Sequence, residues 1–371
     1  MTAHPIEAKL SEYLHNKAAR AHLPLSGSFE LTPLCNLQCK MCYVRMSRAE
    51  QEAIAPLRTA EEWCTLAQTA KERGMLYLLL TGGEPFLRPD FRELYERLHA
   101  MGLLLSINTN GTMITEETVQ WLSEKPPVRL NITLYGASNE TYARLCGNPN
   151  GFTQTTRAIR LLQEAGIGVK LNGSLTPYNC DDLEEMFAFA EREGLILQAT
   201  SYMFPPMRRD RAAIGTNDRF TPEDAAYYAA KIEALTRGRE RFLGTQPDAL
   251  HIPSECEETE GEPMRCRAGR SSFWVTWDGR LMPCGMIETE HAPNVFETGF
   301  DEAWKQAYES VEAIRLPPEC KACEAKGYCL SCAAMVMTES GCYHKRPQYR
   351  CLMTQAYPTQ HLRVQQELSK P

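Results

Sequence analysis

The stretch Cys35-Asn36-Leu37-Gln38-Cys39-Lys40-Met41-Cys42 decides how the rest of the chain is interpreted, because its cysteines follow the spacing C-x3-C-x2-C. Three thiolates on one short loop can hold three irons of a four-iron cluster. A ferredoxin-type site supplies four cysteines, since its irons only carry electrons. The next cysteine is Cys64, too distant for the same loop, so one iron would keep an open position, which is typical of catalytic sites. The alternative is a zinc loop, which normally collects four ligands.

A second motif follows at the end of the next predicted strand. The apolar run 75–80 leads directly into the loop Gly82-Gly83-Glu84-Pro85, where two glycines permit close backbone approach. Alone, this loop is a plausible turn. Placed after a three-cysteine loop, it resembles the radical S-adenosylmethionine (SAM) superfamily. The resemblance implies that the methionine part of SAM chelates the open iron and that Gly82, Gly83, Glu84 and Pro85 bind its ammonium, with Glu84 as the partner.

Polar residues at the ends of later strands are the predicted remaining contacts to SAM. These residues are Asn108, Asn110, Asn131, Thr133, Asn172 and Ser174. Many members of the superfamily carry Ser-x-Asp-Gly where this chain has Thr133-Leu134-Tyr135-Gly136, so its ribose contacts depart from the usual pattern. The alternative for all six is ordinary polarity at strand ends.

Helices and strands alternate through the first two thirds of the chain. The predicted strands are 28–32, 75–80, 103–108, 128–134, 167–175 and 195–202. The predicted helices are 5–22, 59–73, 89–100, 115–123, 152–165, 181–193, 222–237 and 301–314. This alternation indicates an α/β fold with parallel strands and right-handed crossovers. We expect a partial (β/α)6 TIM-like barrel followed by a small cysteine-rich auxiliary iron–sulfur domain.

The expected organisation has four parts. An N-terminal helix occupies 1–24, the radical SAM partial barrel 25–210, a connecting region 211–255 and the auxiliary domain 256–371. In the last part, segments 273–277 and 280–283 flank Asp278-Gly279, a strong signal for a hairpin.

Nine cysteines lie between Cys256 and Cys351, spaced as Cys266-x12-Gly279-x4-Cys284 and Cys320-x2-Cys323-x5-Cys329-x2-Cys332, with Cys342 and Cys351 beyond. This pattern resembles the SPASM domain, although the family usually has three residues between the last two cysteines of the quartet. The resemblance implies two auxiliary four-iron clusters. The first would take Cys266, Cys284 and Cys332. Its fourth ligand, if any, would be Cys256, with Cys342 as the alternative. The second would take Cys320, Cys323, Cys329 and Cys351. A zinc ribbon is the alternative, since paired C-x2-C units also suit zinc.

Composition excludes several classes of function. The 371 residues carry a formal net charge of −7 and no basic run, which argues against nucleic acid as a partner. There is no secretory signal and no apolar stretch long enough to span a membrane, so we expect a cytoplasmic protein. Fifteen cysteines without an export signal favour metal chemistry over disulfides.

The resemblance implies reductive cleavage of SAM to a 5′-deoxyadenosyl radical, which abstracts hydrogen from a substrate. Members with this auxiliary domain mostly modify ribosomally made peptides or proteins, by thioether or carbon–carbon cross-linking or by epimerisation. Sulfatase maturation is disfavoured, because those members carry an Asp directly after the Gly-x4-Cys cysteine and this chain has Gly285. The alternatives are the same chemistry on a small molecule, such as a tetrapyrrole or cofactor precursor, and a non-catalytic zinc or electron-transfer protein.

Several partners and donors follow from this interpretation. We expect an electron donor such as flavodoxin or ferredoxin. Only 34 residues precede Cys35, too few for the winged leader-binding domain of about a hundred residues that many relatives carry. A peptide leader would then dock on a separate protein or on a barrel edge formed by Tyr202, Phe204, Pro205, Pro206 and Arg208.

Lone cysteines could donate hydrogen atoms to a substrate radical. Cys180, predicted at a helix N-terminus on the catalytic face, and Cys146, which follows the fourth strand, are the two hydrogen-donor residues we consider. The alternative for each is a small buried hydrophobe, and Cys64 on an apolar helix face is expected to be one.

Overall fold

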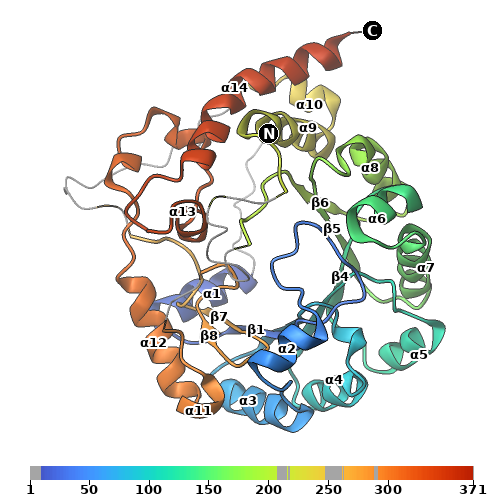
Figure 1. Ribbon diagram of the computed structural model, residues 1–371, viewed down its shortest axis with the longest axis vertical. Helices are drawn as coiled ribbons and strands as arrows, with labels where there is room; N and C mark the ends of the chain where they lie inside the picture. Colours follow the sequence, from blue (N-terminus) through green and yellow to red (C-terminus); the bar gives the residue numbers. More distant parts are fainter. Residues whose placement is uncertain are drawn as a thin grey trace, which may run out of the picture.

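The computed structural model describes residues 10–206, 215, 218–246, 261, 263–287 and 291–370. At its centre is a curved sheet with the strand order β6-β5-β4-β3-β2-β1-β7-β8, surrounded by helices (Figure 1). Its strands are β1 Ser26–Glu30, β2 Tyr77–Thr81, β3 Leu104–Thr109, β4 Arg129–Thr133, β5 Val169–Ser174, β6 Leu197–Thr200, β7 Ser272–Val275 and β8 Leu281–Met282. All neighbouring strands are parallel except β7 and β8. The α/β partial barrel expected from the sequence is confirmed.

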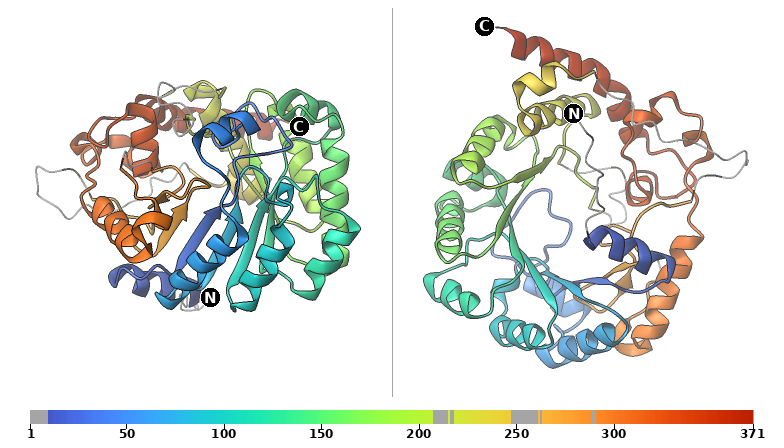
Figure 2. Two further views of the ribbon diagram at one scale, coloured as in Figure 1. Left: turned by 60° about the horizontal axis from the view of Figure 1, so that its bottom comes forward. Right: turned by 180° about the vertical axis from the view of Figure 1, so that it is seen from behind.

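The helices cover the outside of the sheet. They are α1 Leu10–Arg20, α2 Arg48–Ile54, α3 Ala60–Glu72, α4 Phe91–Ala100, α5 Glu116–Glu124, α6 Asn139–Cys146, α7 Gly151–Glu164, α8 Leu183–Arg192, α9 Pro222–Arg237, α10 Arg239–Leu243, α11 Val295–Thr298, α12 Phe300–Glu312, α13 Ala333–Ser340 and α14 Gln348–Ser369. The sequence did not predict α2, α6, α10, α11, α13 or α14. Figure 2 shows α1 at the end of the sheet where the strands begin and α2 at the opposite end.

Each barrel strand has an apolar outer face and a more polar inner face. On β3, Leu105 and Ile107 are buried in the core shared with the helices, whereas the alternate residue Asn108 faces the interior. The same alternation places Asn131 and Asn172 on the inner faces of β4 and β5. The predicted SAM contacts on the strands therefore line the inside of the barrel.

The β7–β8 hairpin, expected in the auxiliary domain, extends the barrel sheet instead. Strand β7 pairs with β1 in parallel, with Ser28 opposite Trp274 and Phe29 opposite Val275. Phe273 and Val275 are buried in the same core as Phe29, which explains the pairing. The Asp278-Gly279 turn is confirmed by the antiparallel β7–β8 pair. The domain limits stay predictions, and the sheet runs across the expected boundary.

Beyond the edge strand β6, helices α9 and α14 pack on each other and continue the ring (Figure 1). A buried ion pair between Arg219 and Glu339 joins the segment before α9 to α13, with Arg219 Nη2 donating to Glu339 Oε2 at 2.8 Å. No helix in the part of the chain that the structure describes is long and apolar enough to cross a membrane.

Candidate metal centres and cofactor site

The three-cysteine loop leaves the carboxyl end of β1 and is held by the last turn of α6. The N–H groups of Gln38 and Lys40 donate to the carbonyls of Cys146 and Leu145, at 2.8 and 3.2 Å. Leu37 and Leu145 are buried together beneath the loop. Gly147 ends α6 with φ of 72°, a left-handed conformation that favours glycine. Helix α6 therefore fixes the position of the cysteines.

The thiols of this loop are half-buried and receive nitrogen donors. The Leu37 N–H donates to Cys35 Sγ at 3.4 Å, and the Arg45 N–H donates to Cys42 Sγ at 3.3 Å. Burial raises the pKa of Cys35 to about 12, whereas a hydrogen bond from Cys146 lowers the pKa of Cys39. N–H donors to sulfur stabilise thiolates and tune bound clusters, so this loop fits three irons of a four-iron cluster.

The glycine pair is required by contact with the cysteine loop. A Cβ on Gly83 would lie 2.2 Å from the carbonyl oxygen of Leu34, and a Cβ on Gly82 would lie 2.5 Å from that of Thr32. The N–H groups of Gly83 and Glu84 donate to these same two carbonyls, at 2.6 and 2.9 Å. The Gly-Gly-Glu segment thus contacts the backbone of Thr32 and Leu34, the residues that lead into the cysteine motif. This proximity supports a shared cofactor site.

The carboxylate of Glu84, the predicted partner of the SAM ammonium, is held by donors of the protein itself. It is fully buried and accepts hydrogen bonds from the Thr109 hydroxyl and from the N–H groups of Asn110 and Phe86, at 2.8 to 3.2 Å. Burial raises the pKa of Glu84 to about 7, and these hydrogen bonds only partly oppose the shift. The geometry argues against direct contact between Glu84 and the SAM ammonium. Pro85 begins the 3-10 turn Pro85–Leu87 that Glu84 caps.

Among the predicted polar contacts, Asn110 binds the cysteine loop itself. Its Nδ2 donates to Asn36 Oδ1 at 2.9 Å and contacts Cys35 Sγ at 3.8 Å, and its Oδ1 accepts from the Thr112 N–H. The Asn110 side chain therefore positions Cys35, because its amide already contacts residues of the protein.

Two further predicted contacts face each other on the inner wall. Asn131 Nδ2 donates to Asn108 Oδ1 at 2.8 Å, while the Asn131 Oδ1 is buried without a partner in the described part of the chain. Thr133 lies opposite Asn172 in the β4–β5 register, and Ser174 lies two residues further along β5. These positions agree with a ligand inside the barrel, although their contacts to SAM stay predictions.

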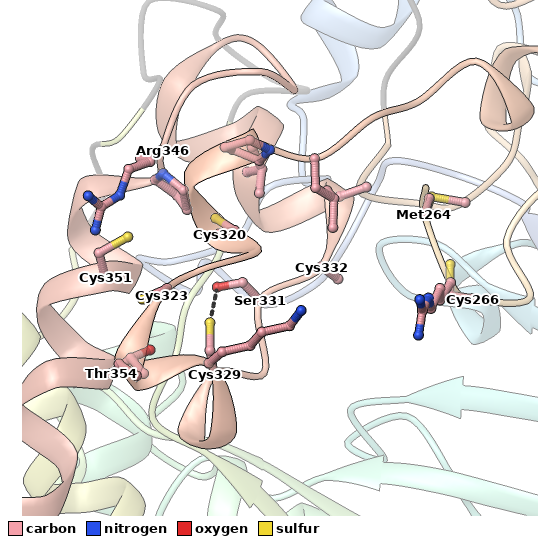
Figure 3. Close-up of a pocket in the computed structure, with 18 of the residues that line it drawn as sticks. Met264, Cys266, Cys320, Cys323, Cys329, Ser331, Cys332, Arg346, Cys351 and Thr354 are labelled. Atoms are coloured by element: carbon pink, nitrogen blue, oxygen red, sulfur yellow. Dashed lines mark hydrogen bonds between the residues drawn. The ribbon is translucent and has the colours of Figure 1, made fainter. Parts of the chain in front are cut away.

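The auxiliary cysteines gather around one cavity (Figure 3). Residues Cys320, Cys323, Cys329 and Cys351 lie together, as the sequence predicts for the second cluster. Burial raises the pKa of Cys320 to about 11, and the neighbouring thiols add to the shift. The Arg346 side chain hydrogen-bonds to Cys351, which suits an anionic cluster. This donor set fits a four-iron cluster.

The predicted ligands of the first auxiliary cluster are also close to one another. Burial raises the pKa of both Cys266 and Cys284, and each is raised further by the charge of Cys332. Tyr343 packs against the same group with its hydroxyl buried and without a partner in the described residues. Cys256 lies outside the described residues. The choice between Cys256 and Cys342 as fourth ligand stays a prediction.

The three lone cysteines lie in different environments. Cys146 is 1% exposed and contacts Cys39 from behind, which argues against a hydrogen-donor role toward a substrate. Cys180 is half-buried against Tyr228 of α9, and its role as a hydrogen donor stays a prediction. Cys64 is buried in the helix–sheet core, as expected.

The predicted docking edge is largely part of the core. Tyr202 is 5% exposed, and its hydroxyl donates to Glu339 Oε1 at 2.7 Å. Phe204 packs beside Tyr202, with ring centroids 5.1 Å apart. Pro205 and Pro206 follow directly, and Arg208 lies outside the described residues. Tyr202 is therefore unavailable for docking, whereas Phe204 is partly exposed, so the docking edge stays a prediction.

Comparisons with known proteins agree with this geometry. Residues 29–190 match the radical SAM superfamily, and residues 266–333 match an iron–sulfur cluster-binding domain named SPASM. The AdoMet-dependent heme synthase of Methanosarcina barkeri is 27% identical over 349 residues, which cover 89% of this chain and 97% of the relative. The PqqA peptide cyclase of Rhizobium meliloti is 25% identical over 328 residues, which cover 85% of this chain and 84% of the relative.

Solved structures share the fold. SuiB of Streptococcus suis bound to S-adenosylmethionine superposes with a TM-score of 0.65 at 18% identity, covering 93% of this chain and 83% of that protein. The anSMEcpe protein with bound AdoMet gives a TM-score of 0.66 at 17% identity, covering 93% of this chain and all of that protein (100%). At such low identity the likeness concerns the fold alone.

Proposed function

Because this protein is a radical SAM enzyme with a C-terminal SPASM domain, we propose that it modifies a ribosomally made peptide. The modification would be a thioether or carbon–carbon cross-link or an epimerisation, each of which begins with removal of a hydrogen atom from carbon. The observation that carries the proposal is the backbone contact of Gly83 and Glu84 with Thr32 and Leu34, which lead directly into the Cys35–Cys39–Cys42 loop. A second group of cysteines lines a cavity in the C-terminal part of the chain.

The residues of the site have separable tasks in this proposal. When bound, a four-iron cluster on Cys35, Cys39 and Cys42 supplies the electron that splits SAM into methionine and the 5′-deoxyadenosyl radical. The glycine pair lets the segment of Thr32 and Leu34 approach the Gly-Gly-Glu-Pro loop. Asn110 holds Cys35, and the inner wall with Asn131 and Asn172 would orient the nucleoside. The barrel excludes water from the radical.

The peptide is favoured by the names of several relatives, and the residue after Cys284 argues against sulfatase maturation. Relatives include PqqA peptide cyclases and the subtilosin biosynthesis protein AlbA of Bacillus subtilis, which is 25% identical over 332 residues. Gly285 follows Cys284, where sulfatase-maturing members would need an Asp. A separate leader-binding protein and a flavodoxin or ferredoxin as reductant complete the proposal.

A small-molecule substrate is the second proposal, and one observation favours it. Three relatives are AdoMet-dependent heme synthases, and one of them aligns over 97% of its own length. We therefore keep a tetrapyrrole or a cofactor precursor as the alternative substrate.

The test begins with anaerobic reconstitution by iron and sulfide. We expect about twelve irons for three four-iron clusters, and 5′-deoxyadenosine after addition of SAM and dithionite. A Cys35→Ala/Cys39→Ala/Cys42→Ala variant should lose the nucleoside and about four irons. A mass shift on a peptide co-expressed from the same gene neighbourhood would support the peptide, whereas turnover of a tetrapyrrole with no peptide change would favour the alternative. Intact SAM would refute both.

A further inference from the structure

A second cavity opens at the edge of the barrel sheet. It lies between β6, helices α9 and α14 and the loop 327–330, which contains Cys329 of the second auxiliary group. Thr200 and Tyr202 line it from the carboxyl end of β6, and Arg350 lines it from α14. Thr354 lines both this cavity and the cysteine-lined cavity of Figure 3, so the two are neighbours.

Arg350 has an unusual environment for a buried cation. Arg350 is 6% exposed, and its Nε is buried without a hydrogen-bond partner in the described part of the chain. Its Nη1 donates to the thioether sulfur of Met353 at 2.9 Å, a weak acceptor. The guanidinium lies 5.8 Å from the centre of the Tyr202 ring. Among the described residues no carboxylate forms an ion pair with it.

Neighbouring arginines are neutralised by carboxylates. Arg219, equally buried, is paired with Glu339 and lies 3.5 Å from the centre of the Tyr349 ring. Arg237, which lines the same cavity, is paired with Glu233 at 2.9 Å. The positive charge of Arg350 is therefore the one in this cavity that lacks a counter-ion among the described residues. A buried charge without a partner is costly, so it marks a position where an anion is expected.

We propose that Arg350 binds a carboxylate of the substrate in this cavity, an inference that rests on the proposed function. A planar guanidinium pairs with a carboxylate through two parallel N–H donors, and the single unpaired positive charge suits a single negative charge. The site lies at the carboxyl end of β6, the end at which β1 delivers the cysteine loop. A substrate anchored here would extend from the second auxiliary cysteines toward the barrel mouth.

The test is calorimetric titration of the reconstituted protein with carboxylate probes and their uncharged isosteres. N-acetyl-glutamate amide represents a peptide side chain, and propionate represents a small-molecule carboxylate. N-acetyl-glutamine amide and propionamide are the controls. We expect the carboxylates to bind, the amides to bind at least about tenfold more weakly, and Arg350→Met to remove that difference. Stronger binding of the glutamate probe assigns the site to a peptide, and equal binding assigns it to a small molecule.

A matched variant and a folding control keep the proposal refutable. Arg363→Met on the same helix removes an exposed cation paired with Glu367, outside the cavity, and should leave binding unchanged. Because Arg350 lacks a counter-ion, Arg350→Met should keep or raise the thermal midpoint, whereas Arg219→Met should lower it. A comparable fall for Arg350→Met, a loss of iron from that variant, or chloride binding as strong as that of the carboxylates would each overturn the proposal.

These outcomes are independent of SAM cleavage. The titration is performed without SAM, so a protein that produces 5′-deoxyadenosine but shows no Arg350-dependent carboxylate binding would overturn this inference alone. A protein that binds the probes through Arg350 and leaves SAM intact would instead overturn the proposed function.

Discussion

At the scale of single residues, the contact between Gly83 and the cysteine loop is the tightest requirement of the site. We expect Gly83→Ala to displace the loop, since the new Cβ would lie 2.2 Å from the Leu34 carbonyl oxygen. The expected result is loss of about four irons and of SAM cleavage, with a cost of about 1–3 kcal/mol in the free energy of unfolding. Iron analysis and chromatography of 5′-deoxyadenosine measure both.

Gly244→Ala is the matched control for this substitution. Gly244 has φ of −85°, and its added Cβ would meet nothing closer than 3.7 Å. This variant should keep its full iron content. A Gly83→Ala protein with wild-type iron and activity would show that the loop can shift without consequence.

Glu84 makes the stability of the protein depend on pH in a defined window. Burial raises the pKa of Glu84 from 4.5 to about 7. Between these values the folded protein binds a proton that the unfolded chain has released, so the free energy of unfolding falls as the pH rises. The total loss is on the order of 3 kcal/mol, complete above the folded pKa.

The measurement is the difference in thermal midpoint between wild type and Glu84→Gln. From about pH 4.5 to about pH 7 the wild type should lose stability relative to the variant, which has no proton to release. Parallel curves across this range would mean that Glu84 is already ionised in the folded protein.

Glu84 also shows which part of the site could not be predicted from the sequence. The cysteine spacing and the Gly-Gly-Glu-Pro loop were sufficient to predict the cofactor chemistry, because metal ligands of a short loop need only local order. Whether Glu84 contacts a ligand depends on donors from Thr109 and Asn110, which lie 25 and 26 residues further along the chain. Arg350 was missed for a similar reason, since a missing counter-ion is a property of the packed structure.

At the scale of secondary structure, the longer helices between the barrel strands were predicted, whereas most short helices and the 22-residue α14 were not. Thr59 and Glu62 form the capping box expected at the start of α3. Helix α6 has eight residues and follows a polar loop, so its sequence resembles a connection. Its role is evident only from the hydrogen bonds that its last turn makes with Gln38 and Lys40.

This role of α6 predicts that its N-cap affects the distant metal site. Ser138 Oγ accepts from the Thr141 N–H at 3.1 Å, and Ser138→Ala should destabilise α6 by about 1 kcal/mol. Because α6 holds the cysteine loop, we expect faster iron release to a chelator. Thr115→Ala removes the equivalent cap of α5, which accepts from the Thr118 N–H at 3.2 Å, and serves as control. Equal release rates from the two variants would contradict a specific link between α6 and the loop.

At the scale of the whole molecule, β1 connects the two groups of cysteines. It delivers the first cysteine loop at its carboxyl end, pairs with β2 on one side and pairs with β7 on the other. The β7–β8 hairpin lies between Cys266 and Cys284 in the chain, so the barrel sheet positions these two auxiliary cysteines relative to the first loop. Periodicity predicted the strands of the barrel, but this pairing joins segments about 245 residues apart and no local pattern specifies it.

This arrangement predicts that the auxiliary clusters can be removed without abolishing SAM cleavage. The cysteine loop after β1 makes its contacts with α6, with Asn110 and with the glycine pair, all within the barrel. A Cys320→Ala/Cys323→Ala variant should therefore lose about four of about twelve irons. It should still form 5′-deoxyadenosine in the absence of substrate, yet give no modified product, since the second auxiliary group lies beside the cavity in which we place the substrate. The control is Cys64→Ala, which removes a buried thiol outside both groups and should keep all irons and yield product. If the double variant also fails to cleave SAM while its barrel cluster is intact, electrons must reach SAM through the auxiliary domain, and the two groups of cysteines act as one path.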